Sequence, residues 1–200
     1  MNLTTQIIYL AFTYLLGAIP FAYILTLRAT GKNIMEHGSG NVGSTNVKRV
    51  AGKKIAMYTQ LLDMLKGLLP VAILLVSSSQ DWITYPPFYI YLVALAAILG
   101  HDFSIFLLFK GGKGVNTTLG ASILLSPVPV LIAVAIYFIV KKVFKFVSMG
   151  SIALSITMPL AEYFLHGLTN AFYYLIVAAL LIIARHYKNI RRLLSGKENL

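Results

Sequence analysis

Long, continuous apolar runs constrain the fold of this 200-residue chain more than any other feature. Hydrophobic residues make up 58% of the sequence and charged residues only 12%, so polar side chains are too few to cover a surface that faces water. The solvent that suits such a chain is the interior of a lipid bilayer, where long apolar runs form spanning helices. The sequence therefore predicts an all-α, polytopic membrane protein.

Seven of these runs are expected to form transmembrane helices. A straight span needs about 20 residues, so the fourth and fifth runs are short. Joining them would give six spans, but the segment Ser126-Pro127-Val128-Pro129 places two helix-breaking prolines between them. The predicted spans cover residues 5–27, 55–76, 86–99, 116–125, 130–140, 146–164 and 171–184.

The charges of the loops favour seven spans over six. With a turn at Pro127, every second loop is basic and the loops between them carry no Lys or Arg. The positive-inside rule then places the N-terminus outside and the C-terminus in the cytoplasm. Sixteen of the 17 Lys and Arg residues lie on the cytoplasmic side in this arrangement, and the exception is Lys66.

The formal charge of +11 indicates an anionic partner, either nucleic acid, anionic lipid or a phosphate-bearing substrate. Nucleic acid is a poor partner, because the basic residues are expected to face lipid headgroups without a groove-reading element. The sequence has no cysteine, which excludes disulfides, thiolate metal sites and an acyl-cysteine intermediate. H-E-x-x-H and G-x-S-x-G patterns are also missing, so we expect no metal and no cofactor.

The chain is expected to form one membrane-embedded domain over residues 1–198. No basic residue or cleavage pattern marks a signal peptide, so the first apolar run should remain in the mature protein. Glu198-Asn199-Leu200 matches the start of a common engineered protease site, and residues 199–200 are treated as a possible tag remnant. The sequence leaves the oligomeric state open.

The first basic loop, from Gly38 to Arg49, combines glycines, hydroxyls, amides and cations. It matches G-x-G-x-x-G formally, but it follows a membrane span rather than a strand, so a dinucleotide site is rejected. Glycines let backbone N–H groups approach an anion, and Arg49 can hold a phosphate with two hydrogen bonds. We expect a phosphate site here, with a flexible polar turn as the simpler alternative. The other candidate binding residues are Ser39, Asn41, Ser44, Thr45 and Asn46.

A second basic loop surrounds Lys113 with Gly111, Gly112 and Gly114. It is not a P-loop, because the lysine is followed by glycine instead of Ser or Thr. The three glycines and the helix expected from about Asn116 still favour an anion-binding loop. The alternative is a tight turn whose lysine serves only membrane topology.

The basic tail begins at Arg185 and contains His186 and Asn189. These two residues are three apart, so they share a face if the last helix continues through them. A lone histidine at this position is typical of a membrane-surface anchor. The basic and polar residues around His186 favour a role in the phosphate site instead. Within the second span, Asp63 and Lys66 are one turn apart and are expected to form an ion pair, since unpaired charges in lipid are costly.

Three stretches of this sequence resemble, in order and spacing, the bacterial PlsY family of acyl-phosphate glycerol-3-phosphate acyltransferases. They are GSGNVGSTNVKRVAG from Gly38, GHDFSIFLLFKGGKGV from Gly100 and HYKNIRRLLSGKE from His186, with LDMLKG from Leu62 as a fourth. Ser44 stands where many relatives are expected to have alanine. The resemblance implies transfer of a fatty acyl group from acyl phosphate to the 1-hydroxyl of glycerol 3-phosphate. It also implies a bacterial inner-membrane location, with the site facing the cytoplasm and membrane lipid around it.

The resemblance also implies roles for the loops. The first loop, together with His186 and Asn189, would position glycerol 3-phosphate. Lys113 and the neighbouring glycine N–H groups would hold the acyl phosphate and stabilise the oxyanion. Ser151 would add a hydroxyl from the same side. The proton of the attacking hydroxyl would go to His186 or to the substrate's own phosphate, and the sequence leaves both open.

Two other functions fit an anion site in a helical bundle. A transporter of phosphate-bearing solutes would be expected to show repeated halves and broken helices, and no internal repeat is found. A non-catalytic subunit that binds anionic lipid would need only scattered Lys and Arg, without the glycine-rich loops.

Overall fold

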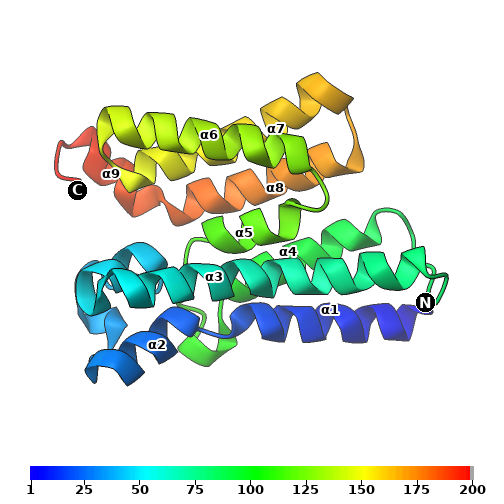
Figure 1. Cartoon of the computed structure of the whole chain (residues 1–200), viewed down its shortest axis with the longest axis horizontal. Helices are drawn as coiled ribbons and strands as arrows, with labels where there is room; N and C mark the ends of the chain where they lie inside the picture. Colours follow the sequence, from blue (N-terminus) through cyan, green and yellow to red (C-terminus); the bar gives the residue numbers. More distant parts are fainter. Residues whose placement is uncertain (199–200) are drawn as a thin grey trace. The chain divides into compact units, whose positions relative to one another are not determined.

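The computed structural model describes residues 1–198, and within them the regular secondary structure is helical throughout (Figure 1). The all-α prediction is therefore confirmed, while the possible tag remnant at 199–200 lies outside the described residues. The α-helices are α1 (Leu3–Ala18), α2 (Phe21–Thr30), α3 (Ser44–Ser79), α4 (Tyr89–Asp102), α5 (Val115–Ser122), α6 (Pro127–Phe144), α7 (Val147–His166), α8 (Asn170–Arg185) and α9 (Tyr187–Leu194), and the 3-10 helices are η1 (Ile34–Glu36) and η2 (Ile105–Leu107).

The chain divides into two compact units, Met1–Ala121 and the part from Ser122 onwards. In the first unit α1 packs along α4, and α3 contacts both α2 and α4. In the second unit α7 packs against both α6 and α8. The expectation of one domain over residues 1–198 stays a prediction.

Helices occupy all seven predicted apolar runs. Four helical stretches of the described chain are long and apolar enough to cross a membrane, and α8 with α9 makes a fifth if that bent pair counts as one span. At about 1.5 Å per residue, the 8 residues of α5 are too short to cross a hydrocarbon core of about 30 Å alone. The number of seven spans and the orientation of the termini stay predictions.

The predicted interruption before the fifth run is present. Ser126 caps α6, and Pro127 and Pro129 lie inside its first turn instead of forming the loop. Proline is tolerated there because the first N–H groups of a helix have no partner within the helix. The fifth helix therefore begins three residues earlier than the sequence indicated.

The first span is broken, although a single helix over 5–27 was expected. Pro20 has no N–H and disfavours helical geometry in the residue before it, and Ile19 accordingly has φ −56° and ψ 119°. The carbonyl groups exposed by the break accept hydrogen bonds from other elements. Ser104 Oγ donates to Ala18 O over 2.5 Å, and Lys66 Nζ donates to Ile19 O over 2.9 Å. The break thereby ties α1 to α3 and to the turn that follows α4.

The two ends of the first unit differ in chemistry. The Met1 amino group donates to Thr84 O, and Tyr89 Oη donates to Gln6 O over 2.8 Å. The N-terminus therefore lies beside the loop between α3 and α4, in which Asp81 is the one charged residue. Near the α1–α2 break, the basic loops share an apolar cluster. Its members are Ala22, Ile34, Val42, Val47 and Ala56, with Leu107 packed against them.

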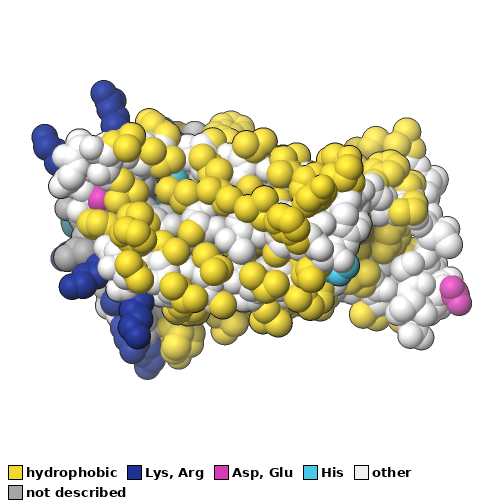
Figure 2. Space-filling model, turned by 90° about the horizontal axis from the view of Figure 1, so that it is seen from above, with side chains coloured by type: hydrophobic (Ala, Val, Ile, Leu, Met, Phe, Trp, Pro, Cys, Tyr) yellow, Lys and Arg dark blue, Asp and Glu magenta, His cyan; other side chains and the backbone are white. Residues whose placement is uncertain are grey.

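The surface agrees with a chain that lies in lipid. On the face shown in Figure 2, hydrophobic side chains cover the middle, and Lys and Arg side chains gather towards one end. Many large apolar side chains of the spanning helices are exposed, such as Ile8 at 63% and Leu131 at 61%. Patches of this extent are typical of a membrane-facing surface.

Candidate active site

The first basic loop is built around the side chain of Asn46. This residue is 2% exposed, and the two hydrogens of its Nδ2 are shared among three carbonyl oxygens, those of Ile34, His37 and Asn41, at 3.3, 3.0 and 3.1 Å. Its Oδ1 accepts from Ser39 N over 2.9 Å. These bonds make Asn46 the residue that shapes the loop, and its predicted contact with substrate stays a prediction.

Two glycines of this loop have a clear structural reason. Gly38 and Gly40 have φ values of +61° and +68°, which residues with a side chain rarely adopt. A Cβ on Gly38 would also stand 2.2 Å from Asn46 Oδ1. The loop therefore depends on glycine for its conformation.

The remaining residues of the first loop lie near the start of α3. Ser39, Thr45 and Arg49 are exposed, whereas Asn41 and Ser44 are half-buried. Asn116 Nδ2 donates to Ser44 Oγ over 3.3 Å, which joins this loop to the start of α5. Gly52, with φ +86° and ψ 173°, interrupts α3 and separates the segment that carries Arg49 from the long span.

The glycine loop around Lys113 packs onto the last turn of α4. Gly112 N donates to His101 O over 3.0 Å. A Cβ on Gly111 would stand 2.1 Å from His101 O, and one on Gly114 would stand 3.0 Å from Asp102 Oδ1. These glycines are thus required by close packing, a reason that the sequence did not indicate, and their predicted role in anion binding stays a prediction. Lys113 itself is half-buried.

His186 lies at a bend of 59° between α8 and α9. The last helix therefore does not run straight through His186 and Asn189, which was the condition for their sharing a face. The two side chains are nevertheless buried, at 2% and 7% exposure. His186 Nδ1 lies 2.8 Å from Ile182 O, and a carbonyl oxygen only accepts, so Nδ1 carries the hydrogen.

No role was predicted for Glu198, which ends the HYKNIRRLLSGKE stretch and begins the match to an engineered protease site. Its Oε1 accepts from Ser148 Oγ over 2.9 Å and from Asn189 Nδ2 over 2.5 Å, and its Oε2 accepts from Arg192 Nε over 2.8 Å. Partial burial raises the pKa of Glu198, but these hydrogen bonds outweigh it and bring the pKa below the ordinary value. The carboxylate joins α9 to the start of α7.

Ser151 lies one turn after Ser148 on α7 and is 4% exposed. Its Oγ donates its hydrogen to Val147 O over 3.0 Å. With that hydrogen in use, the hydroxyl oxygen would contact a ligand as a hydrogen-bond acceptor. Arg49 and Lys113 belong to the first unit, while Ser151, His186 and Asn189 belong to the second. The predicted meeting of the two sets at one site stays a prediction.

A model of the family described as glycerol-3-phosphate acyltransferase matches residues 7–196 of this chain. The glycerol-3-phosphate acyltransferase of Clostridium acetobutylicum is 44% identical over 187 residues, which are 93% of this chain and 94% of the relative. The one from Syntrophotalea carbinolica is 40% identical and is covered over 98% of both chains.

Crystal structures of PlsY (YgiH), an integral membrane glycerol 3-phosphate acyltransferase, have the same fold. The glycerol 3-phosphate form matches with a TM-score of 0.87 at 35% identity, covering 98% of this chain and 94% of that one. The lysophosphatidic acid form matches with a TM-score of 0.84 over the same shares. This chain is therefore an integral membrane acyltransferase and belongs to the glycerol-3-phosphate acyltransferase family.

Proposed function

We propose that this protein transfers a fatty acyl group from acyl phosphate to the 1-hydroxyl of glycerol 3-phosphate. The products are lysophosphatidic acid, which stays in the membrane, and inorganic phosphate. The name of the relatives and the ligands of the similar PlsY structures support the acceptor and the lipid product. The observation that carries the proposal is a pair of cation-bearing glycine loops that share one end of an apolar helical unit.

The reaction needs charge neutralisation more than a strong nucleophile. Acyl phosphate is a mixed anhydride with a good leaving group, so alignment of the two substrates lowers much of the barrier. The hydroxyl oxygen forms a bond to the acyl carbon, and the bond between that carbon and the phosphate oxygen breaks. Lys113, with the N–H groups of Gly111, Gly112 and Gly114, would hold the acyl phosphate and stabilise the oxyanion.

Glycerol 3-phosphate would be held by the first loop and the tail. Arg49 would bind its phosphate with two hydrogen bonds, supported by hydroxyl and amide groups. His186 or the substrate's own phosphate would take the proton of the attacking hydroxyl. The supporting residues are Ser39, Asn41, Ser44, Thr45, Ser151 and Asn189, with Asn46 holding the loop in shape.

An apolar cavity of about 590 Å³ in the first unit suits the acyl chain. Its walls come from α2, η1 and η2, and a lysine lies at its edge. The side chains that we expect to touch the acyl chain are Tyr23, Ile24, Met35, Phe106, Leu107 and Leu108, with Lys110 beside them. Binding of the chain here would bring its acyl phosphate towards the glycine loop that follows Lys110.

The active site would face the cytoplasm in the inner membrane of a bacterium. The positive-inside rule supports this side, because the two basic loops of the first unit share an end away from the N-terminus. Glycerol 3-phosphate would then arrive from water and acyl phosphate from the bilayer.

Purified protein in detergent tests the proposal directly. Acyl phosphate and glycerol 3-phosphate should give lysophosphatidic acid and phosphate, while acyl-CoA and acyl carrier protein should not replace acyl phosphate. Arg49→Ala and Lys113→Ala should each abolish the product without preventing folding. Uptake of glycerol 3-phosphate into liposomes without product would instead indicate a transporter and would contradict the proposal.

A further inference from the structure

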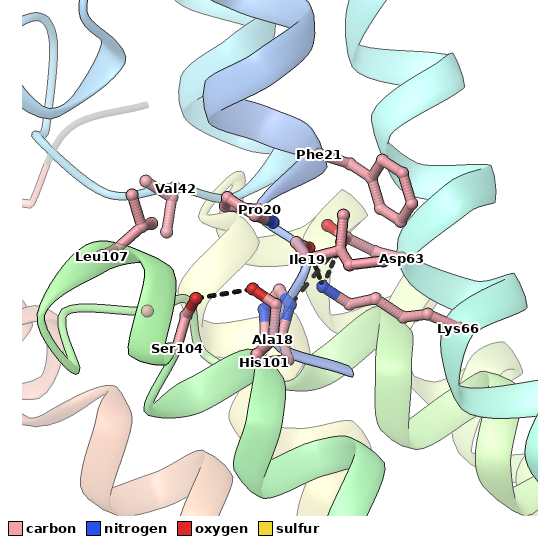
Figure 3. A pocket seen from close by; sticks show the side chains of 11 residues that line it. Ala18, Ile19, Pro20, Phe21, Val42, Asp63, Lys66, His101, Ser104 and Leu107 are labelled. Atoms are coloured by element: carbon pink, nitrogen blue, oxygen red, sulfur yellow. Dashed lines mark hydrogen bonds and ion pairs between the residues drawn. The ribbon is translucent and has the colours of Figure 1, made fainter. Parts of the chain in front are cut away.

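A buried charged network lies at the break between α1 and α2 (Figure 3). Asp63 and Lys66 are 1% and 3% exposed, and Nζ and Oδ1 lie 2.9 Å apart, so the predicted ion pair is confirmed. Lys66 also donates to Ile19 O and lies 5.7 Å from the centre of the Phe21 ring. The pair therefore reaches from α3 to the junction of α1 and α2.

Stability alone is a weak reason for these charges. Removing two ions from water is costly, and replacing a buried ion pair by apolar side chains of similar volume is often neutral or stabilising. Ionisable residues inside membrane helices usually serve function. Neither Asp63 nor Lys66 belongs to the proposed binding residues. A function of the ion pair would therefore act through the groups that the pair contacts.

His101, in the last turn of α4, extends the network. Its Nδ1 lies 3.6 Å from the Asp63 oxygen that pairs with Lys66. On the other side of the ring, a Cβ on Gly112 would stand only 2.1 Å from Nε2, so Gly112 is in close contact with the imidazole. The His101 ring is thus held between Asp63 and Gly112.

The glycine loop also follows the backbone of this turn. Gly112 N donates to His101 O, and Gly111 packs against the same oxygen. A rotation of the His101 ring or a shift of the end of α4 would therefore displace Gly112, and with it the next residue, Lys113.

We propose that Asp63, Lys66 and His101 form a positioning network that sets the place of Lys113. Lys66 fixes Asp63 and the α1–α2 junction, Asp63 orients His101, and His101 supports the glycine loop. The inference rests on the proposed function, in which this loop holds a substrate phosphate.

The informative variant is Asp63→Asn/Lys66→Met, which removes both charges together and leaves no unpaired buried ion. A second variant, His101→Gln, keeps the ion pair and removes the ring. Tyr9→Phe is the matched control, because it removes another α1–α3 hydrogen bond, from Tyr9 Oη to Pro70 O over 2.8 Å. Neither Tyr9 nor Pro70 lines the pocket of Figure 3.

Hydrogen exchange of the amides over residues 110–116 reports on the loop without any turnover. In both network variants we expect faster exchange there. The KM for acyl phosphate, which this loop is proposed to hold, should rise by about fivefold or more, and the KM for glycerol 3-phosphate should change by less than about twofold. Tyr9→Phe should lower the melting temperature with neither effect.

Unchanged exchange over 110–116 would overturn the inference, and so would unchanged KM values in active network variants. Failure of the wild-type protein to make lysophosphatidic acid is a different result, because it would contradict the proposed function itself.

Discussion

The hydrogen bonds of His186 bear directly on which group removes a proton from the substrate. With its hydrogen on Nδ1, the ring would have to accept a proton at Nε2 if His186 acts as the general base. The ring is almost fully buried, and the bond to Ile182 O fixes its orientation. This orientation is the one that the base hypothesis needs, and the choice between His186 and the substrate's own phosphate stays a prediction.

His186→Ala separates these two possibilities. If His186 is the base, kcat should fall by about 10² to 10⁴-fold with little change in either KM, because the interaction is made only in the transition state. Tyr187→Phe, at the exposed next residue, should behave as the wild type. A retained kcat with a raised KM would assign the proton to the substrate's phosphate and leave His186 a binding role.

At the scale of elements, the glycine loop and the C-terminal tail are each held by a few close contacts. The glycine loop lies so near the end of α4 that it has no room for side chains at Gly111 and Gly112. In the tail, the carboxylate of Glu198 accepts hydrogen bonds from donors on α7 and α9. The glycine loop therefore depends on the helix just before it, and the tail depends on a contact with Ser148, which is 50 residues away.

Gly111→Ala should damage the enzyme more than Gly112→Ala. The Cβ at Gly111 would meet backbone atoms of His101 and Asp102, which cannot rotate away, whereas the Cβ at Gly112 would meet the His101 ring. We expect a raised KM for both variants and a larger loss of kcat/KM for Gly111→Ala. Gly167→Ala is the control, since φ +76° and ψ −152° lie in a region nearly restricted to glycine and cost about 1 to 3 kcal/mol of stability, but no neighbouring atom is close. Equal kcat/KM values in all three variants would contradict the packing argument.

Glu198→Gln should change how stability depends on pH. The pKa of Glu198 is lower in the folded state than its ordinary value of 4.5, so the folded protein favours the carboxylate. This contribution is fully present above the unfolded pKa and is lost as the pH falls through the lower, folded pKa. Melting temperatures between about pH 7 and pH 3 should therefore fall more steeply for the wild type than for Glu198→Gln. Parallel curves would show that the carboxylate is not held as described.

At the scale of the whole molecule, charge and apolarity are separated along the chain. The lipid-facing helices expose large apolar side chains, and the basic residues are confined to loops and helix ends apart from Lys66. This separation gives the chain a preferred orientation in the bilayer.

The predicted orientation can be tested with single cysteines, because the chain has none of its own. Gln80→Cys, in an exposed loop expected outside, should react with a membrane-impermeant maleimide in intact cells. Lys188→Cys, also exposed but expected inside, should react only after the cells are opened. The reverse pattern would invert the topology and move the proposed site to the outer face.

Properties that depend on neighbours in sequence were predictable. Apolar runs indicated the helices because a bilayer selects for apolar length, and Pro127 and Pro129 indicated the interruption before the fifth run, although both lie in the first turn of α6. The ion pair of Asp63 and Lys66 followed from their spacing of one helical turn, and it is present. The break at Ile19-Pro20 has the same kind of signal, a proline, but it lies within a long apolar run that predicted a single helix.

Contacts between distant segments were decided only by the tertiary structure. Asp63 meets His101 from another helix, Asn46 satisfies carbonyl groups up to 12 residues away, and Glu198 reaches back to Ser148. No local pattern specifies such partners, because they depend on how the helices pack. By itself the sequence determined a membrane-embedded helical protein with cation-bearing glycine loops, whereas packing decided which buried groups hold those loops in place.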